Sequence, residues 1–136
     1  RFGDPETQVV LPLLKSDLLT VMQATTNGTL EDVPVEFSTD SACCVVLASE
    51  GYPKKYETGF EITVPDEYAD SVYVAGAKLD AGRLVTSGGR VLGAVAAAPT
   101  LPEAIKNAYG IADSITFENK YMRRDIGKRA LSAIKD

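Results

Sequence analysis

The chain has 136 residues, with 14 Lys and Arg against 19 Asp and Glu for a net charge of −5, and it contains no His, no Trp and two Cys. This length fits one domain of ordinary size, which can bury about two-thirds of its unfolded surface without disulfides or metals. The lack of His excludes Ser-His-Asp and Cys-His catalytic groups and His-ligated metal sites. The acidic charge disfavours a broad nucleic-acid surface, and no apolar run approaches the roughly 20 residues that cross a bilayer.

The pattern of residues 1–28 predicts helices. Asp4 is a candidate N-cap because a proline and an acid follow it, as in a first helical turn. Pro12 is expected to end or kink this helix. Ser16 and Asp17 can start a second helix, which Asn27-Gly28 is expected to end. The polar stretch that follows, up to residue 40, is typical of a connection.

From Ser41 onward, short apolar runs alternate with turn residues, which is typical of strands. The first run carries Cys43 and Cys44, and its continuous apolar character predicts a strand buried on both faces, with both thiols free in a reducing cytoplasm. A hairpin turn is expected at Asp80-Ala81-Gly82. The predicted strands are residues 43–48, 60–64, 71–75, 83–86, 90–98 and 115–117.

Two helices are predicted in the second half of the chain. Thr100 and Glu103 have the spacing of a capping box, and the helix that they begin is expected to end near residues 108–110. Residues 121–134 predict another helix at the end of the chain. The expected fold class is therefore α+β, with a mostly antiparallel sheet covered by one or two helices.

The strongest local charge signal is the segment Arg123-Arg124-Asp125-Ile126-Gly127-Lys128-Arg129, which holds four cations and one acid. Arginine presents a planar fork that matches phosphate, and a helix that starts here would add N–H groups that favour an anion. A solvated basic face or an interdomain salt bridge fits the same residues equally well. The residues alone leave both interpretations open.

Two further segments have a functional interpretation beside a simpler one. The turn Thr86-Ser87-Gly88-Gly89-Arg90 could bring backbone N–H groups close to an anion, although a plain hairpin turn explains it better. Asp4 could hold an ammonium group or a metal, although a helix cap explains it better.

Three segments taken together resemble the phosphoribosylamine–glycine ligase family, also called glycinamide ribonucleotide synthetases. They are residues 1–8, 84–92 and 121–131, and residues 45–53 are similar to the same family. The resemblance covers essentially the whole chain but corresponds only to the C-terminal third of the enzyme. It implies an ATP-grasp ligase of purine (IMP) biosynthesis in the cytoplasm, whose C-terminal domain resembles the small β-rich domain of biotin carboxylase.

The resemblance also implies the reaction. ATP converts the carboxylate of glycine into glycyl phosphate, and the amine of 5-phosphoribosylamine attacks it to give glycinamide ribonucleotide, ADP and phosphate. The full enzyme is expected to use Mg²⁺ or Mn²⁺ with ATP, held by metal ligands upstream of Arg1. The chain starts without Met and is expected to be a fragment or processed product, inactive alone, that packs on the missing N-terminal and ATP-grasp lobes.

The same resemblance divides the chain and assigns roles. Residues 1–28 correspond to the end of the ATP-grasp domain, and residues 29–136 to the substrate-side domain. Arg123 and Arg124 are expected to hold the ribose phosphate, and Asp4 the substrate amine. The other residues implied at the site are Arg1, which could stabilise the acyl phosphate, and the turn residues Ser87, Gly88 and Gly89.

Two other hypotheses stay open from the sequence. One is a stand-alone, non-catalytic β-rich module that binds a phosphate metabolite or a protein. The other is a carboxylase-type ATP-grasp enzyme whose substrate lacks a ribose phosphate.

Overall fold

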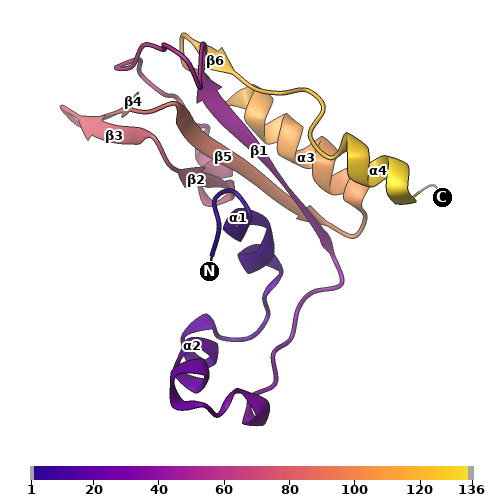
Figure 1. The fold of residues 1–136 in the computed structure, drawn as a ribbon. Helices are drawn as coiled ribbons and strands as arrows, with labels where there is room; N and C mark the ends of the chain where they lie inside the picture. The colour runs from indigo at the N-terminus through magenta and orange to yellow at the C-terminus, as the bar shows by residue number, and fades with distance from the viewer. Residues whose placement is uncertain (1, 135–136) are drawn as a thin grey trace.

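A four-stranded antiparallel sheet, in the order β2-β5-β1-β6, organises the chain (Figure 1). The structure is a computed structural model that describes residues 2–134. β1 (Ser41–Ser49) and β5 (Arg90–Ala98) are long and pair with each other along most of their length. The short strands β2 (Val72–Val74) and β6 (Lys120–Tyr121) flank them. The predicted α+β class with an antiparallel sheet is confirmed.

Helix α3 (Leu101–Ser114) lies along one face of this sheet (Figure 1). Thr100 caps it as predicted, because its hydroxyl accepts a hydrogen bond from the Glu103 N–H and donates to the Glu103 carboxylate. The predicted end near residue 110 is wrong. The helix continues because Ile111 and Ala112 lie in the core against the sheet, and that burial stabilises the last turn.

The two faces of β1 differ in burial, so the predicted burial on both faces is wrong. Val45 and Leu47 are fully buried in the core, which also contains the apolar face of α3. Val46 and Cys44 point the other way along the strand and are only partly covered. Both cysteines are free, and burial raises the pKa of the Cys44 thiol to about 11.

A separate hairpin projects from the sheet. It consists of β3 (Ala77–Asp80) and β4 (Arg83–Thr86), and its turn is the one that the sequence predicts. Ala81 and Gly82 both adopt left-handed backbone angles, with φ of 48° and 81°. Such a turn matches the twist of paired strands, which explains why a glycine stands at its second central position. The strand β3 itself is not predicted from the sequence.

Residues 2–40 precede the sheet, and we call them the N-terminal arm: its helix α1 lies beside the sheet, and its part around α2 extends away from it (Figure 1). Its α2 helix starts and ends as predicted. The Asp17 carboxylate accepts a hydrogen bond from the Thr20 N–H at 2.7 Å, and Gly28 ends the helix with a φ of 71°. The elements of the arm are α1 (Thr7–Val10), η1 (Leu11–Leu13), α2 (Leu18–Asn27) and η2 (Leu30–Asp32).

The predicted capping role of Asp4 is wrong. Helix α1 begins only at Thr7, and Glu6 occupies the N-cap position without a capping side-chain bond. The Thr7 hydroxyl instead donates to the Gly3 carbonyl. The Asp4 side chain is turned toward the sheet, where it meets a cation from β5.

Three other predictions of secondary structure are also wrong: two strands and the length of the last helix. Residues 60–64 and 115–117 are not strands but contribute isolated bridges, one of which joins Thr63 to Thr116. The C-terminal helix α4 spans only Lys128–Ile134, because the preceding residues form β6 and a turn. The six-residue 3-10 helix η3 (Asp66–Ser71) precedes β2. Among the described helices, none is both long and apolar enough to cross a membrane.

Candidate functional site

A pocket of about 410 Å³ lies where the N-terminal arm meets the sheet face that α3 leaves uncovered. Val46 of β1 lines it, and strand residues of that parity point away from α3. We call it the sheet pocket. Its walls come from the arm, from β1 and the loop after it, from β5, and from the segment around β6: Pro5, Val46, Ala48, Tyr52, Pro53, Arg90, Tyr121, Met122, Arg123 and Ile126.

Arg123 lines this pocket with an exposed guanidinium. Its Nε and Nη2 donate to the two carboxylate oxygens of Asp125 at 2.9 and 2.7 Å. This pair raises the pKa of Arg123 and lowers the pKa of Asp125. Because an arginine has five N–H donors, the pairing leaves Nη1 for an incoming anion. The side chain is 64% exposed, so the ion pair with Asp125 does not close the pocket.

Arg124 points in another direction and does not line the sheet pocket. Its Nη2 lies 2.8 Å from a carboxylate oxygen of Asp113 on α3, and a hydrogen bond to Asp113 raises the pKa of Arg124. Its guanidinium also lies over the ring of Tyr109, 5.8 Å from the centroid. The two guanidiniums, for which the resemblance implies one common role, are thus separated in the structure.

Asp4 precedes Pro5 of the sheet pocket and pairs with Arg90 of its wall. Arg90 Nη2 donates to its carboxylate at 2.9 Å, and Nη1 donates to its carbonyl oxygen at 3.2 Å. Gln8 donates to the second carboxylate oxygen at 3.1 Å. These contacts join the arm to the start of β5 across 86 residues of sequence.

Arg90 is the site residue that sequence reasoning missed. It lines the sheet pocket, and together with Arg123 it places two cations on the pocket wall. The only available signal was its position at the end of the glycine-rich turn before a strand of small residues. No local pattern connects it to Asp4, because only folding brings the two together.

The turn residues Ser87, Gly88 and Gly89 are not among the residues that line the sheet pocket. Ser49, which is fully buried, donates from its hydroxyl to the Gly88 carbonyl at 3.0 Å and from its N–H to the Gly89 carbonyl at 2.8 Å. A Cβ atom on Gly89 would lie 2.1 Å from the ring of Tyr52, a residue of the pocket wall. The glycine therefore lets this ring pack against the turn. Arg1, the remaining candidate, lies outside the described residues.

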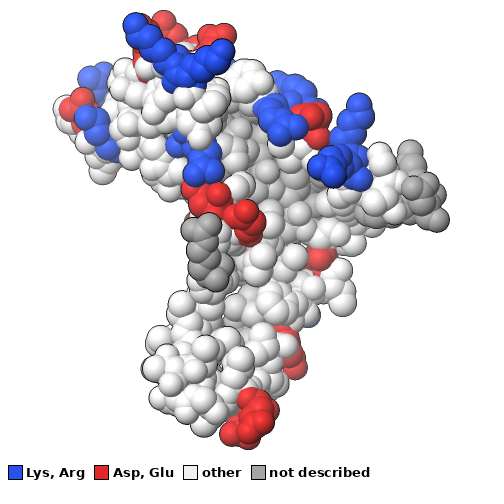
Figure 2. Space-filling model, viewed as in Figure 1, with Lys and Arg blue, Asp and Glu red and all other residues white. Residues whose placement is uncertain are grey.

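Positive side chains gather over the sheet half of the face drawn in Figure 2. Acidic side chains lie directly beside several of them, and a further acidic group lies between the sheet and the arm (Figure 2). This half of the face includes the two arginines of the pocket wall, and each of them is paired with a carboxylate.

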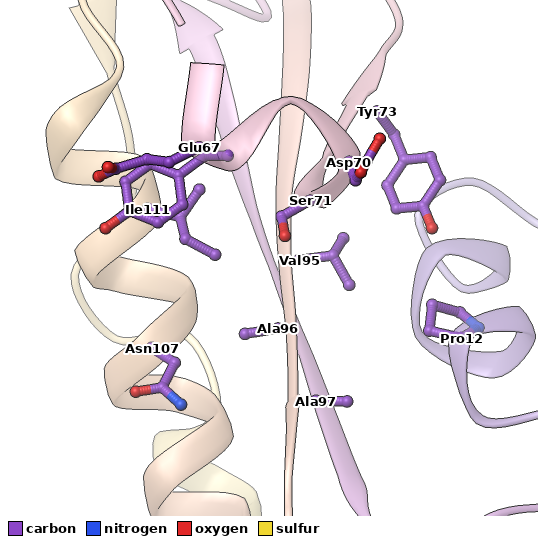
Figure 3. Close-up of a pocket in the computed structure, with 11 residues that line it drawn as sticks. Pro12, Glu67, Asp70, Ser71, Tyr73, Val95, Ala96, Ala97, Asn107 and Ile111 are labelled. Carbon is purple, nitrogen blue, oxygen red and sulfur yellow. The ribbon is translucent and has the colours of Figure 1, made fainter. Parts of the chain in front are cut away.

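A second pocket, of about 420 Å³, lies beside β5 between α3 and η1 (Figure 3). Figure 3 shows Glu67 and Asp70 of η3 at its edge, with Tyr73 and Asn107 contributing polar atoms. The described residues that line this pocket include two carboxylates and no cation. The pocket is therefore a poor site for a phosphate.

Metal ligands are not grouped in the described part of the chain. Within residues 2–134, no three Asp, Glu or Cys side chains come together in a way that could hold a metal ion. These residues therefore do not fit a magnesium site of their own, which usually needs carboxylates beside a substrate phosphate.

The fold and the pocket together define an antiparallel α+β domain with two arginines facing a cavity on its open sheet face. The family described as "Phosphoribosylglycinamide synthetase, C domain" matches residues 42–129. The chain belongs to this family.

Similar proteins agree with this assignment. A phosphoribosylamine–glycine ligase from Clostridium acetobutylicum is 52% identical over 128 residues, which are 94% of this chain and 31% of that protein. A second such ligase, from Chlorobaculum tepidum, is 51% identical over 96% of the chain and 32% of its own length. The solved structure of the Thermotoga maritima ligase matches with a TM-score of 0.82 and 40% identity, over 93% of this chain and 31% of that one. The chain thus spans about a third of the length of these relatives.

Proposed function

We propose that this chain is the C-terminal, substrate-side part of a phosphoribosylamine–glycine ligase. In that enzyme, ATP drives the joining of glycine to 5-phosphoribosylamine, with glycyl phosphate as the intermediate. The observation that carries the proposal is the identity of about half of all residues to such ligases over 94% to 96% of the chain. A match of that extent favours the ligase over a stand-alone binding module.

The proposed role of the sheet pocket is to bind the phosphate of 5-phosphoribosylamine. Arg123 offers Nη1 to a phosphate oxygen, and Arg90 adds positive charge on the same wall. Asp4, beside the pocket, holds the amine end of the substrate, since a carboxylate stabilises a group that carries or develops positive charge. In this arrangement the chain binds and orients the nucleophile, which lowers the entropic part of the barrier.

The binding sites for ATP and the metal ion are proposed to lie in the portion of the relatives that this chain does not match. ATP and Mg²⁺ or Mn²⁺ would bind there, and when bound they activate the carboxylate of glycine. The arm exposes large apolar side chains, which include Val10, Leu19 and Met22. Their exposure fits the proposal that residues 1–28 belong to the ATP-grasp domain and contact that portion. A cytoplasmic location follows from the same proposal.

A chimeric enzyme tests the proposed function. In the Clostridium acetobutylicum ligase, the matched third is replaced by this chain, and phosphate release is measured with and without glycine and 5-phosphoribosylamine. We expect release that depends on both substrates. A chimera that is folded and binds ATP but releases no phosphate with both substrates present would contradict the proposal.

The two arginines give a sharper test in the same chimera. Arg123→Ala is expected to raise the KM for 5-phosphoribosylamine by about 10- to 100-fold, because one charge-assisted hydrogen bond to the phosphate is lost. Arg124→Ala is expected to raise it less, because its guanidinium lies on α3. Arg123→Lys is the matched control, since it keeps the charge and should recover part of the affinity. An unchanged KM in Arg123→Ala removes the phosphate role of this residue.

A further inference from the structure

The hydroxyl of Tyr109 bridges the two ends of the turn that carries the arginines. Tyr109 lies on α3, and its Oη donates to the carbonyl oxygen of Arg123 at 2.8 Å. The same Oη accepts from the N–H of Ile126 at 3.1 Å. One side-chain oxygen thus satisfies a backbone acceptor and a backbone donor that lie 14 and 17 residues further along the chain.

These two backbone groups are the ones that normally close a tight turn. In a β-turn, the carbonyl of the first residue accepts from the N–H of the fourth, and Arg123 and Ile126 occupy those two positions. Here the hydroxyl of Tyr109 stands between them. The turn is therefore held by a side chain of α3, and its position depends on that helix.

The ring of Tyr109 contacts the second arginine. The guanidinium of Arg124 lies over it, and Asp113, one helical turn further along α3, pairs with the same guanidinium at 2.8 Å. With Arg124 held on α3, Arg123 is the arginine of this turn that lines the sheet pocket.

Helix α3 is a firm support for this contact. The side of α3 that faces the sheet carries Ala104, Ala108 and Ala112, which are fully buried. At its C-terminal end, the Lys120 ammonium donates to the carbonyl of Ala112 at 3.0 Å and also to that of Ile115. These contacts satisfy carbonyl groups that the helix leaves without partners, so α3 has little freedom to shift relative to the sheet.

We propose that Tyr109 is a positioning residue that holds Arg123 in the sheet pocket through the carbonyl of Arg123 and the N–H of Ile126. The effect of Tyr109 on substrate binding rests on the proposed ligase function. The effect of Tyr109 on the geometry of the turn is independent of that function, and the two effects can be measured separately.

The test is Tyr109→Phe, which keeps the ring under Arg124 and removes the hydroxyl. In the chain as it stands, amide hydrogen exchange of Ile126 is expected to become faster, while exchange in β1 stays as in the unsubstituted chain. In the chimeric ligase, the KM for 5-phosphoribosylamine is expected to rise about 5- to 30-fold, with kcat changed less than about twofold. Tyr73→Phe, an exposed tyrosine of β2, is the matched control and should change neither quantity.

The exchange rates and the KM together separate the positioning role of Tyr109 from the ligase function. Unchanged exchange at Ile126, or faster exchange in β1 to the same degree, overturns the positioning role. In an active chimera, faster exchange at Ile126 with an unchanged KM also overturns it. If every chimera is inactive while Ile126 alone exchanges faster in Tyr109→Phe, the turn is held as proposed and it is the ligase function that fails.

Discussion

Two helices with equally good start signals show how different the two halves of this molecule are. Helix α2 of the N-terminal arm has an Asp17 cap, and helix α3 of the sheet region has a Thr100 cap. Yet α2 buries only Ala24, while α3 buries four residues against the sheet. A cap decides where a helix begins, but packing supplies most of its stability. The arm has helices without a core, and the sheet region has both.

The largest expected effect tests this contrast directly. Leu47→Ala is expected to lower the free energy of unfolding by about 2–5 kcal/mol, because it leaves a cavity in the fully buried core. Leu19→Ala in the arm removes the same atoms from a side chain that is 63% exposed, and its effect should stay within about 0.5 kcal/mol. Urea unfolding of both variants measures the difference. Equal losses would show that the arm has a core of its own.

A smaller effect is expected at Gly89, which packs against Tyr52 of the sheet pocket. In Gly89→Ala, the new Cβ would lie 2.1 Å from the Tyr52 ring, so the ring must leave its place on the pocket wall. We expect a loss of about 1–3 kcal/mol in the free energy of unfolding. Gly110→Ala on α3 is the control, because its Cβ meets nothing within 4 Å and alanine favours the helix by about 0.5–1 kcal/mol. A neutral Gly89→Ala would mean that the turn tolerates a side chain.

The contact between the two regions should matter less for overall stability. Asp4→Asn weakens the exposed pair with Arg90, and such pairs contribute about 0–1 kcal/mol. We therefore expect little change in the unfolding transition but faster proteolysis within the arm. Glu61→Gln, which weakens the exposed pair with Arg83 in the sheet region, is the matched control. If both variants leave cleavage of the arm unchanged, the Asp4 pair does not hold the arm to the sheet.

The smallest effect is a shift in the titration of one carboxyl group. A hydrogen bond from Arg123 lowers the pKa of Asp125 from its ordinary value of 3.8. The stabilisation from this pair is therefore complete above pH 3.8 and is lost as the pH falls through the lowered pKa. NMR titration of the Asp125 carboxyl group should give a midpoint below 3.8, and Arg123→Gln should raise it. The Asp17 carboxyl, whose pKa is lowered by its hydrogen bonds to Thr20, should not change in that variant.

The sequence by itself determined features that depend on neighbouring residues. The caps at Asp17 and Thr100, the stop at Gly28 and the hairpin turn at Gly82 all follow from short-range hydrogen bonds and backbone preferences. Strands β1 and β5 follow from long runs of apolar or small residues. The resemblance likewise depends on short segments of sequence and predicted the family to which the chain belongs.

Only the tertiary structure decided which residues meet at the sheet pocket. Asp4 has the local pattern of a helix cap, but Arg90 reaches it across 86 residues and sets its direction. Arg123 and Arg124 are equivalent in the sequence, and the packing of the second on α3 makes them different. The reason is physical: caps and turns are fixed by bonds within a few residues, whereas a side chain's partner across the fold depends on how helices and strands pack.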